Sequence, residues 1–300
     1  MKKQAFIYII LAGILWGTSG IFVHYLSPHG FSSLQMTAVR GVVSLICMAL
    51  YALFTDRSLF KVRWQELIMF AAIGASLFFT ASCYYSSMQM TSVSTAVVLM
   101  YTAPIYVMVF SVLFLGEKLS PMKLVAVGCM LVGCSLVAGI IGGVKFDLLG
   151  IIIGVLSGIA YASYNILTKI SMRGGSRPVS ATVYSFLFMS IIAICVCKPD
   201  QIVNNAAKSP AVTIPLLLGL GICTFVLPYL FYTLAMKTLP AGTASALAIV
   251  EPMAATLFSV ILFDELLDLF SIIGIVLILL AVFLLGYSDN KINKNAGDKK

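Results

Sequence analysis

The sequence predicts an all-α membrane protein with ten transmembrane helices, built from two inverted five-helix repeats. The chain has 300 residues, of which 61% are hydrophobic and only 10% are charged. Soluble domains average about 25% charged residues, and the mean hydropathy here is +1.06. Apolar runs of about 20 residues, the length that crosses a bilayer, fill nearly the whole chain. A segment of the first half also recurs in the second half.

The recurring segment covers residues 102–117 and 250–265, which are 148 positions apart. Within it, five residues match at that offset: Pro104/Pro252, Phe110/Phe258, Ser111/Ser259, Val112/Val260 and Glu117/Glu265. The match continues upstream with Tyr84/Tyr232, Met88/Met236, Thr95/Thr243, Ala96/Ala244 and Leu99/Leu247. An apolar composition alone would give few identities at one fixed offset. A duplicated apolar half-chain is typical of secondary transporters.

The apolar runs define the ten expected spans, within which Gly and Pro are tolerated. They lie at 5–26, 33–54, 67–88, 92–115, 122–140, 148–169, 180–197, 212–235, 241–263 and 269–287. Each half, 1–140 and 148–287, therefore holds five spans. An odd number of spans makes the second copy enter the membrane from the opposite side, which gives inverted topology. The polar, charged residues 288–300 are expected to form a disordered cytoplasmic tail.

The positive charge of the chain predicts its orientation. Of the Lys and Arg residues, fifteen fall on inner segments if the N-terminus is cytoplasmic, against only Lys145, Lys198 and Lys208 outside. By the positive-inside rule, both termini should face the cytoplasm from the inner or plasma membrane. The net charge of +8 is then a topology signal, and no nucleic-acid partner is expected. The first apolar run is too long for a signal peptide, so we expect it to be the first span.

The sequence lacks the common motifs of hydrolases, zinc proteases and nucleotide-binding proteins. It contains no His-Glu-x-x-His helix, no Gly-x-Ser-x-Gly turn and no nucleotide-binding P-loop. The seven cysteines lie within apolar spans, so we expect free thiols. Cys195 and Cys197 would point to nearly opposite sides of a helix, which makes them a poor metal pair. We therefore expect no metal, no cofactor, and neither an enzyme nor an ATP-driven pump.

Small residues four apart recur in the first span of each half. Gly13 and Gly17 lie in the first span, and Gly154 and Gly158 lie at the same point of the sixth. This spacing lets two helix backbones approach closely. We expect a helix interface that both halves share.

Several features together resemble the EamA family of the drug/metabolite transporter superfamily. They are the paired blocks at 104–117 and 252–265, each running from Pro to Gly-Glu or Asp-Glu, the Arg40 of the second span, and the Trp-Gly pair at 16–17. The resemblance covers about residues 5–287. It implies that helices 1–4 and 6–9 enclose a central substrate cavity, with helices 5 and 10 outside as supports. It also implies export or exchange of small metabolites, of which amino acids are the best-known class.

Glu251 is the acidic candidate, because it lies halfway along the ninth span directly before Pro252. An ionised carboxylate at that depth is costly, so it must be protonated, paired or facing a watery cavity. It could couple transport to protons or bind a substrate ammonium group. Alternatively, it is a neutral acid hydrogen-bonded to backbone carbonyls, including that of Ala248, which Pro252 deprives of its usual donor.

Arg40 is the basic candidate, about two turns into the second span. Its rigid fork of donors could hold a substrate carboxylate. It could equally snorkel outward to the interface or fix neighbouring helices through their carbonyls. A pairing of Arg40 with Glu251 is a further option.

Aromatic and small polar residues within the spans are the other candidates for the substrate site. Tyr and Trp offer an apolar face and one hydrogen bond, which suits an amphiphilic metabolite. The alternative is that these rings only pack helices together. The candidates are Trp16, Ser19, Tyr85, Tyr101, Tyr161, Asn165 and Tyr229.

The symmetry-related Pro104 and Pro252 are the hinge candidates. Each removes a backbone hydrogen bond and permits a kink, so helices 4 and 9 are expected to bend in alternation. Glu117 and Glu265 end the same two helices at opposite membrane faces. They could cap or pair with a neighbouring loop, or they could gate the two mouths.

The sequence thus predicts a secondary carrier that works by alternating access within the lipid bilayer. It would export or exchange a small amphiphilic metabolite, first of all amino acids, driven either by the substrate gradient alone or by protons through Glu251. Nucleobase-like metabolites and cationic drugs are the alternative substrates, and a membrane-embedded enzyme is the alternative class. A receptor or scaffold would not need an inverted repeat, and a channel would show a denser polar stripe.

Overall fold

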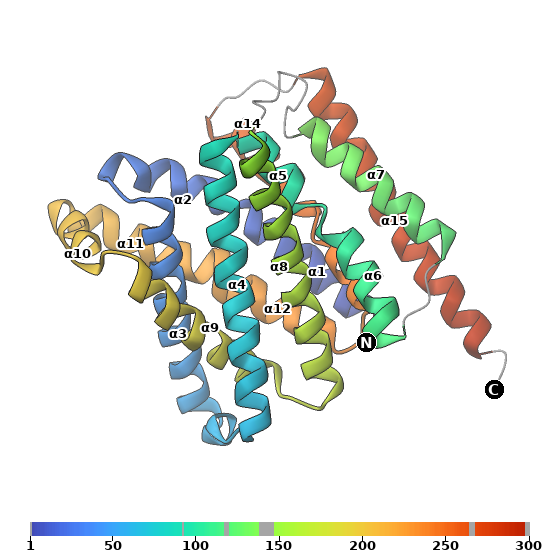
Figure 1. The fold of residues 1–300 in the computed structure, drawn as a ribbon, viewed down its shortest axis with the longest axis horizontal. Coiled ribbons are helices and arrows are strands. Elements are labelled where there is room, and N and C mark those ends of the chain that lie inside the picture. The colour runs from blue at the N-terminus through green and yellow to red at the C-terminus, as the bar shows by residue number, and fades with distance from the viewer. Residues whose placement is uncertain (1, 92, 117–119, 138–146, 264–267, 298–300) are drawn as a thin grey trace.

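A computed structural model describes residues 2–91, 93–116, 120–137, 147–263 and 268–297, and every regular element within these ranges is helical (Figure 1). Eight of the helices are long and apolar enough to cross a membrane. They are Lys3–His29, Ser33–Thr55, Trp64–Met90, Thr95–Leu115, Leu148–Arg173, Pro178–Val196, Pro210–Met236 and Ala241–Leu262. Two shorter apolar helices, Pro121–Val137 and Leu269–Leu284, occupy the positions of the fifth and tenth predicted spans. The prediction of an all-helical membrane protein is confirmed, with eight helices of spanning length.

Several spans consist of more than one helical element. The elements of the first half are α1 (Lys2–Gly17), α2 (Ser19–Leu26), η1 (Ser27–His29), α3 (Ser33–Thr55), η2 (Arg57–Phe60), α4 (Trp64–Met90), α5 (Val93–Met100), α6 (Ala103–Leu115) and α7 (Pro121–Val137). Those of the second half are α8 (Leu148–Arg173), α9 (Pro178–Val196), α10 (Pro199–Lys208), α11 (Pro210–Gly221), η4 (Ile222–Val226), α12 (Leu227–Met236), α13 (Ala241–Leu247), α14 (Val250–Phe263) and α15 (Leu269–Gly297).

Local sequence signals fix where helices begin. Ser32 and Gln35 form a capping box at the start of α3, in which each side chain accepts a hydrogen bond from the other residue's backbone N–H. Asp147 caps α8 by accepting a bond from the Gly150 N–H at 2.7 Å. Proline stands in the first turn of α9 and of α11, where its missing N–H costs nothing.

The fourth and ninth spans are interrupted at corresponding points, just before Pro104 and Pro252. Because Pro252 has no N–H, the Ala248 carbonyl lacks the usual donor. It accepts a hydrogen bond from the Glu251 N–H at 3.0 Å instead, in a tighter turn between α13 and α14. The backbone therefore satisfies the carbonyl for which the sequence suggested the Glu251 side chain as partner. The interruptions lie where hinges are expected, and bending there stays a prediction.

The eighth span contains a π turn, η4, between α11 and α12. Such turns carry one extra residue and are frequent at functional sites. The third span, α4, which corresponds to it in the first half, runs without interruption from Trp64 to Met90. The two halves therefore differ at this helix.

The paired glycine motifs lie at corresponding helix crossings, as the sequence predicts. A Cβ on Gly17 of α1 would lie 2.8 Å from the Ala254 Cβ of α14, so the first span touches the ninth. A Cβ on Gly158 of α8 would lie 3.0 Å from the Leu99 carbonyl oxygen of α5, so the sixth span touches the fourth. The shared interface is confirmed.

Helices α7 and α15 lie side by side along one flank of the bundle (Figure 1). They cross at two glycines: a Cβ on Gly133 would lie 2.7 Å from the Gly274 carbonyl oxygen, and one on Gly274 would lie 2.6 Å from the Gly133 carbonyl oxygen. Their outward residues, such as Val125 and Phe283, are exposed. This is the flanking position that the resemblance implies for helices 5 and 10.

The last helix is longer than expected, because α15 continues to Gly297. The structure differs here from the disorder predicted for residues 288–300, of which the last three lie outside the described residues. No proline interrupts this stretch. A helix already nucleated in an apolar span gains one hydrogen bond for each residue added.

Candidate functional site

A central cavity of about 120 Å³ lies within the bundle. This approaches the ~150 Å³ of an engineered cavity that binds benzene, which is room for a small metabolite. Spans 1–4, 6, 8 and 9 contribute side chains to its wall. The lining residues are Trp16, Ser19, Thr37, Arg40, Leu77, Thr80, Ala81, Tyr84, Tyr85, Met100, Tyr101, Tyr161, Phe225, Tyr229 and Glu251.

Eight of the nine residues predicted for the substrate site line this cavity. The exception is Asn165, which is fully buried. Its side-chain nitrogen donates to the Tyr161 carbonyl at 2.6 Å, and its oxygen accepts from the Tyr232 hydroxyl. One turn beyond Tyr161, Asn165 faces α12 and joins two helices, because both of its polar atoms are used within the protein.

Some lining residues were missed, although the spacing carried a signal. Leu77, Thr80, Ala81 and Tyr84 recur every three to four residues and form one face of α4 with Tyr85. Thr37 likewise precedes Arg40 by three positions on α3.

Arg40 faces the cavity. One terminal guanidinium nitrogen donates to the Tyr85 hydroxyl at 3.5 Å, and the guanidinium carbon lies 5.8 Å from the Phe225 ring centroid. Its Nε is buried and has no hydrogen-bond partner among the described residues. A second donor of the same wall, Trp16 Nε1, is also buried without such a partner. Neither nitrogen can accept a hydrogen bond, so the wall presents two free donors.

Glu251 belongs to the first turn of α14, and its half-buried side chain lines the cavity beside Tyr101. Arg40 and Glu251, both in the described part of the chain, line one cavity without forming an ion pair. A carboxylate at this depth must be protonated, paired or facing a watery cavity. The structure places the Glu251 side chain on the wall of such a cavity.

Tyr229 is the centre of an aromatic cluster on one side of the cavity. Its ring centroid lies 4.7 Å from that of Phe225 and 5.1 Å from that of Trp16, which it meets edge-on at 74°. It also contacts Phe186 and Tyr164 edge-on. Such edge-to-face pairs fix the rings in place, so the cavity has a rigid aromatic wall, and Arg40 lies over its Phe225 ring.

One end of the bundle is tied together by polar contacts between η2 and the start of α9. Arg177 pairs with Asp56 at 3.2 Å and donates to the Ser58 hydroxyl at 2.6 Å. The Ser58 side chain, its N–H and then Arg177 hold the pKa of Asp56 below the ordinary value. The hydroxyls of Ser180 and Tyr184 donate to carbonyls of η2 at 2.8 and 2.9 Å. These bonds fix η2 across the end of α9. Glu117 and Glu265, the other gating candidates, lie outside the described residues.

Two cations of α8 cap neighbouring helices at the same end. The buried Lys169 donates to the carbonyls of Met236 and Leu239 at 2.7 and 2.5 Å. Arg173 donates to the Leu115 carbonyl at the end of α6 at 2.8 Å. Cations suit helix C-termini, where carbonyls lack intrahelical donors.

Replacing Lys169 by Met should destabilise the protein. Two carbonyls would lose a donor, and each unsatisfied buried group costs about 1–3 kcal/mol. We expect a lower melting temperature in detergent. Lys237→Met is the control, because Lys237 is exposed at the end of α12, the helix whose last carbonyl Lys169 caps. Equal melting temperatures for both variants would contradict a stabilising role of Lys169.

A bundle of apolar helices around a cavity with polar groups is the architecture of a polytopic membrane protein with an internal binding site. The EamA-like transporter family model matches the chain twice, over residues 3–139 and 148–287. The chain therefore belongs to the EamA-like transporter family, within the drug/metabolite transporter superfamily, and the resemblance inferred from the repeat is confirmed.

The similar proteins are transporters by name. An uncharacterized transporter of Archaeoglobus fulgidus is 28% identical over 280 residues, covering 92% of this chain and 94% of the relative. One of Clostridium kluyveri is 25% identical, covering 96% and 94%, and YwfM of Bacillus subtilis is 24% identical, covering 95% and 94%. A solved crystal structure of 17% identity superposes with a TM-score of 0.77 over 97% of this chain and 99% of that one, which shows the fold.

Proposed function

We propose that this EamA-like transporter is a secondary carrier that exports or exchanges a small amphiphilic metabolite, most favourably an amino acid. The observation that carries this proposal is the joint placement of Arg40 and Glu251 on one small cavity without a pair between them. A cation and a carboxylate that form no contact ion pair with each other can each take the opposite charge of a zwitterion.

The free donors support a carboxylate as one end of the substrate. Arg40 Nε and Trp16 Nε1 are buried donors that lack a protein partner. Leaving such groups unsatisfied costs about 1–3 kcal/mol each, and a bound carboxylate would remove this cost. The ammonium group would then lie toward Glu251, and the side chain against the ring of Tyr229.

The alternative substrates would interact with fewer of the residues that line the cavity than an amino acid would. A purely cationic drug would gain Glu251 and the aromatic rings, but Arg40 would repel it. A nucleobase-like metabolite could stack on Tyr229 and Phe225, and would leave the charge of Glu251 without a counterpart. Transport, rather than an enzymatic reaction, is the proposed activity.

The mechanism that we propose is alternating access between two inverted five-helix repeats. Ten transmembrane helices follow if α7 and α15 also cross the membrane as the fifth and tenth. The corresponding glycine crossings and the corresponding interruptions of spans 4 and 9 support this symmetry. The positive-inside bias supports an inner or plasma membrane location with both termini cytoplasmic, so that η2 faces the cytoplasm.

The test is efflux from proteoliposomes that contain the purified chain and are preloaded with a mixture of amino acids and nucleobases. Efflux should be followed with and without a pH gradient. We expect release of particular amino acids above the rate of empty liposomes. Release of nucleobases alone would favour the alternative substrate, and no release of either class would overturn the amino-acid assignment.

Arg40→Lys should weaken the binding of amino acids while the protein stays folded. Lysine keeps the charge but lacks the rigid fork of donors, and a hydrogen bond to a charged group contributes about 1.5–3 kcal/mol. We expect an apparent KM for amino acids that is higher by about tenfold or more. Arg57→Lys, on the exposed η2, is the matched control. The KM for an amine that lacks the carboxylate should be unchanged, and an equal rise for that amine would contradict carboxylate binding by Arg40.

A further inference from the structure

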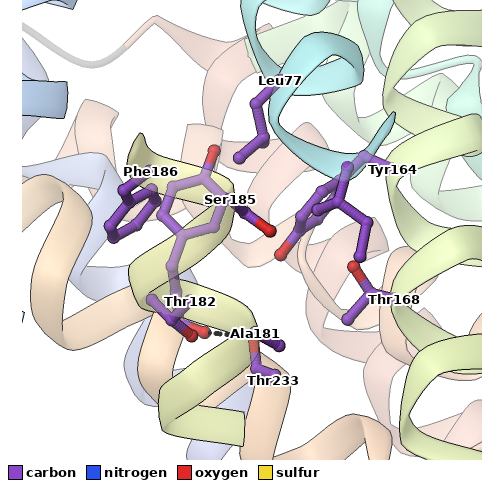
Figure 2. A pocket seen from close by; sticks show the side chains of 10 residues that line it. Leu77, Tyr164, Thr168, Ala181, Thr182, Ser185, Phe186 and Thr233 are labelled. Atoms are coloured by element: carbon purple, nitrogen blue, oxygen red, sulfur yellow. Dashed lines mark hydrogen bonds between the residues drawn. The ribbon is translucent and has the colours of Figure 1, made fainter. Parts of the chain in front are cut away.

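A second, smaller pocket adjoins the central cavity. It lies between α4, α8, α9 and α12, and its volume is about 10 Å³ (Figure 2). That volume is about the minimum that holds one water. Figure 2 shows the side chains of Tyr164, Thr168 and Ser185 turned toward this space.

Three of the six hydroxyl-bearing residues that line this pocket are buried without a well-aligned hydrogen bond. Tyr164, Thr168 and Ser185 are 2%, 2% and 3% exposed, and none makes a well-aligned hydrogen bond within the described ranges, although the Tyr164 hydroxyl lies within reach of those of Thr168 and Thr233. Native proteins satisfy nearly all such groups with protein or water. Three hydroxyls from two helices meet at one water-sized space. The pocket is therefore suited to bind a water molecule or a polar group of a ligand.

A single layer of side chains separates the pocket from the central cavity. Leu77 and Tyr229 line both spaces. On the cavity side Tyr229 contacts Trp16, and on the pocket side it contacts Phe186. A change in the orientation of these two partition residues would join the two spaces.

The pocket lies toward the end of the bundle that η2 covers. The first turns of α9 line it with Ala181, Thr182, Ser185 and Phe186, directly after the segment in which Arg177 and Ser180 bind η2. Tyr184, in the same turns, donates to the Phe60 carbonyl. The order along the bundle axis is therefore the central cavity, the partition, the pocket and η2.

We propose that this pocket is the occluded half of the translocation path, a chamber that holds water when closed and receives the polar groups of the substrate when open. This proposal rests on the proposed carrier function. The partition of Leu77 and Tyr229 closes the chamber toward the central cavity. The contacts of η2 with α9 close it toward the aqueous phase.

The test is the rate at which a thiol placed in the chamber reacts with a membrane-impermeant, cationic methanethiosulfonate reagent. Full-length Ser185→Cys is reconstituted in liposomes, the reagent is added from the η2 side, and modification at position 185 is quantified by peptide mass spectrometry. Reading a single peptide keeps the seven natural cysteines out of the signal. Ser190→Cys is the matched control, because Ser190 lies on the same helix, is 2% exposed and unpaired, and packs beside Gly41 of α3 away from the chamber.

We expect Cys at 185 to react at least tenfold faster than Cys at 190. Arg177→Gln, which removes the ion pair with Asp56, should accelerate the reaction at 185 further and leave 190 unchanged. Equal rates at both positions, including no reaction at either, would overturn the proposal.

A second measurement uses the unaltered chain. In radiolytic footprinting, hydroxyl radicals generated from chamber water should oxidise Tyr164. Protection of Tyr164 equal to that of Tyr232, which is fully buried and hydrogen-bonded, would count against the chamber. Neither readout needs the substrate. Failure of amino-acid transport with rapid labelling at 185 would therefore reject the substrate and keep the chamber.

Discussion

Glu251→Gln is expected to remove the dependence of transport on a pH gradient. The carboxylate faces the central cavity beside Tyr101 and has no ion pair with Arg40, so it can exchange a proton with the cavity. Gln has nearly the same shape but cannot take up or release that proton. In proteoliposomes, we expect gradient-driven transport to fall by at least about tenfold, to the rate seen without a gradient.

The control for this experiment is Asp147→Asn. Asp147 caps α8 away from the cavity, and Asn is an equally good cap, so this acid-to-amide change should leave transport unaltered. A variant at Glu251 that responds to the gradient as the unaltered chain does would show that Glu251 is not the proton site. If the unaltered chain itself ignores the gradient, the protein is a facilitator and Glu251 has another role.

Gly17→Ala is expected to destabilise the protein and to reduce transport. The added Cβ would lie 2.8 Å from the Ala254 Cβ, 2.9 Å from the Ala255 nitrogen and 3.0 Å from the Glu251 carbonyl oxygen. Two of these are backbone atoms, which cannot move aside like the end of a flexible side chain. Overpacking of this kind costs about 1–3 kcal/mol. It also pushes α14, which carries Glu251, away from α1, which carries Trp16.

Gly20→Ala is the matched control, because a Cβ on Gly20 meets nothing within 4 Å. Alanine favours a helix over glycine by about 1 kcal/mol, so this variant should melt at the same or a higher temperature. Melting in detergent and efflux from proteoliposomes measure the two effects. Unchanged melting and transport for Gly17→Ala would show that the crossing of α1 and α14 can widen without consequence.

The spans could be predicted from the sequence because the bilayer imposes a length and a composition on each helix. The second span, expected at 33–54, is α3 at Ser33–Thr55. The charged part of the cavity wall could also be predicted, since ionisable residues in apolar helices must face something other than lipid. Arg40 and Glu251 follow this rule.

Contacts between different helices could not be predicted, because residue spacing along one helix does not reveal which helices are its neighbours. Asn165 lies one turn from Tyr161 and was expected at the cavity, but α12 offers it the Tyr232 hydroxyl as a partner. The bonds from Ser180 and Tyr184 to η2 join residues more than 120 positions apart. Neither residue carries a local signal for its partner.

The π turn η4 preserves a trace of how the two halves diverged. Tyr84 and Tyr232 correspond at an offset of 148, whereas Gly74 and Gly221, which lie at the close crossings of α4 with α9 and of α11 with α3, are only 147 apart. The second half therefore carries one inserted residue between these points, within or beside residues 222–226. A wider turn absorbs the insertion locally, so that Tyr229 still lines the cavity as Ala81, its counterpart at the offset of 148, does. A duplicated gene can thus gain a residue inside a membrane helix without losing the register of either end.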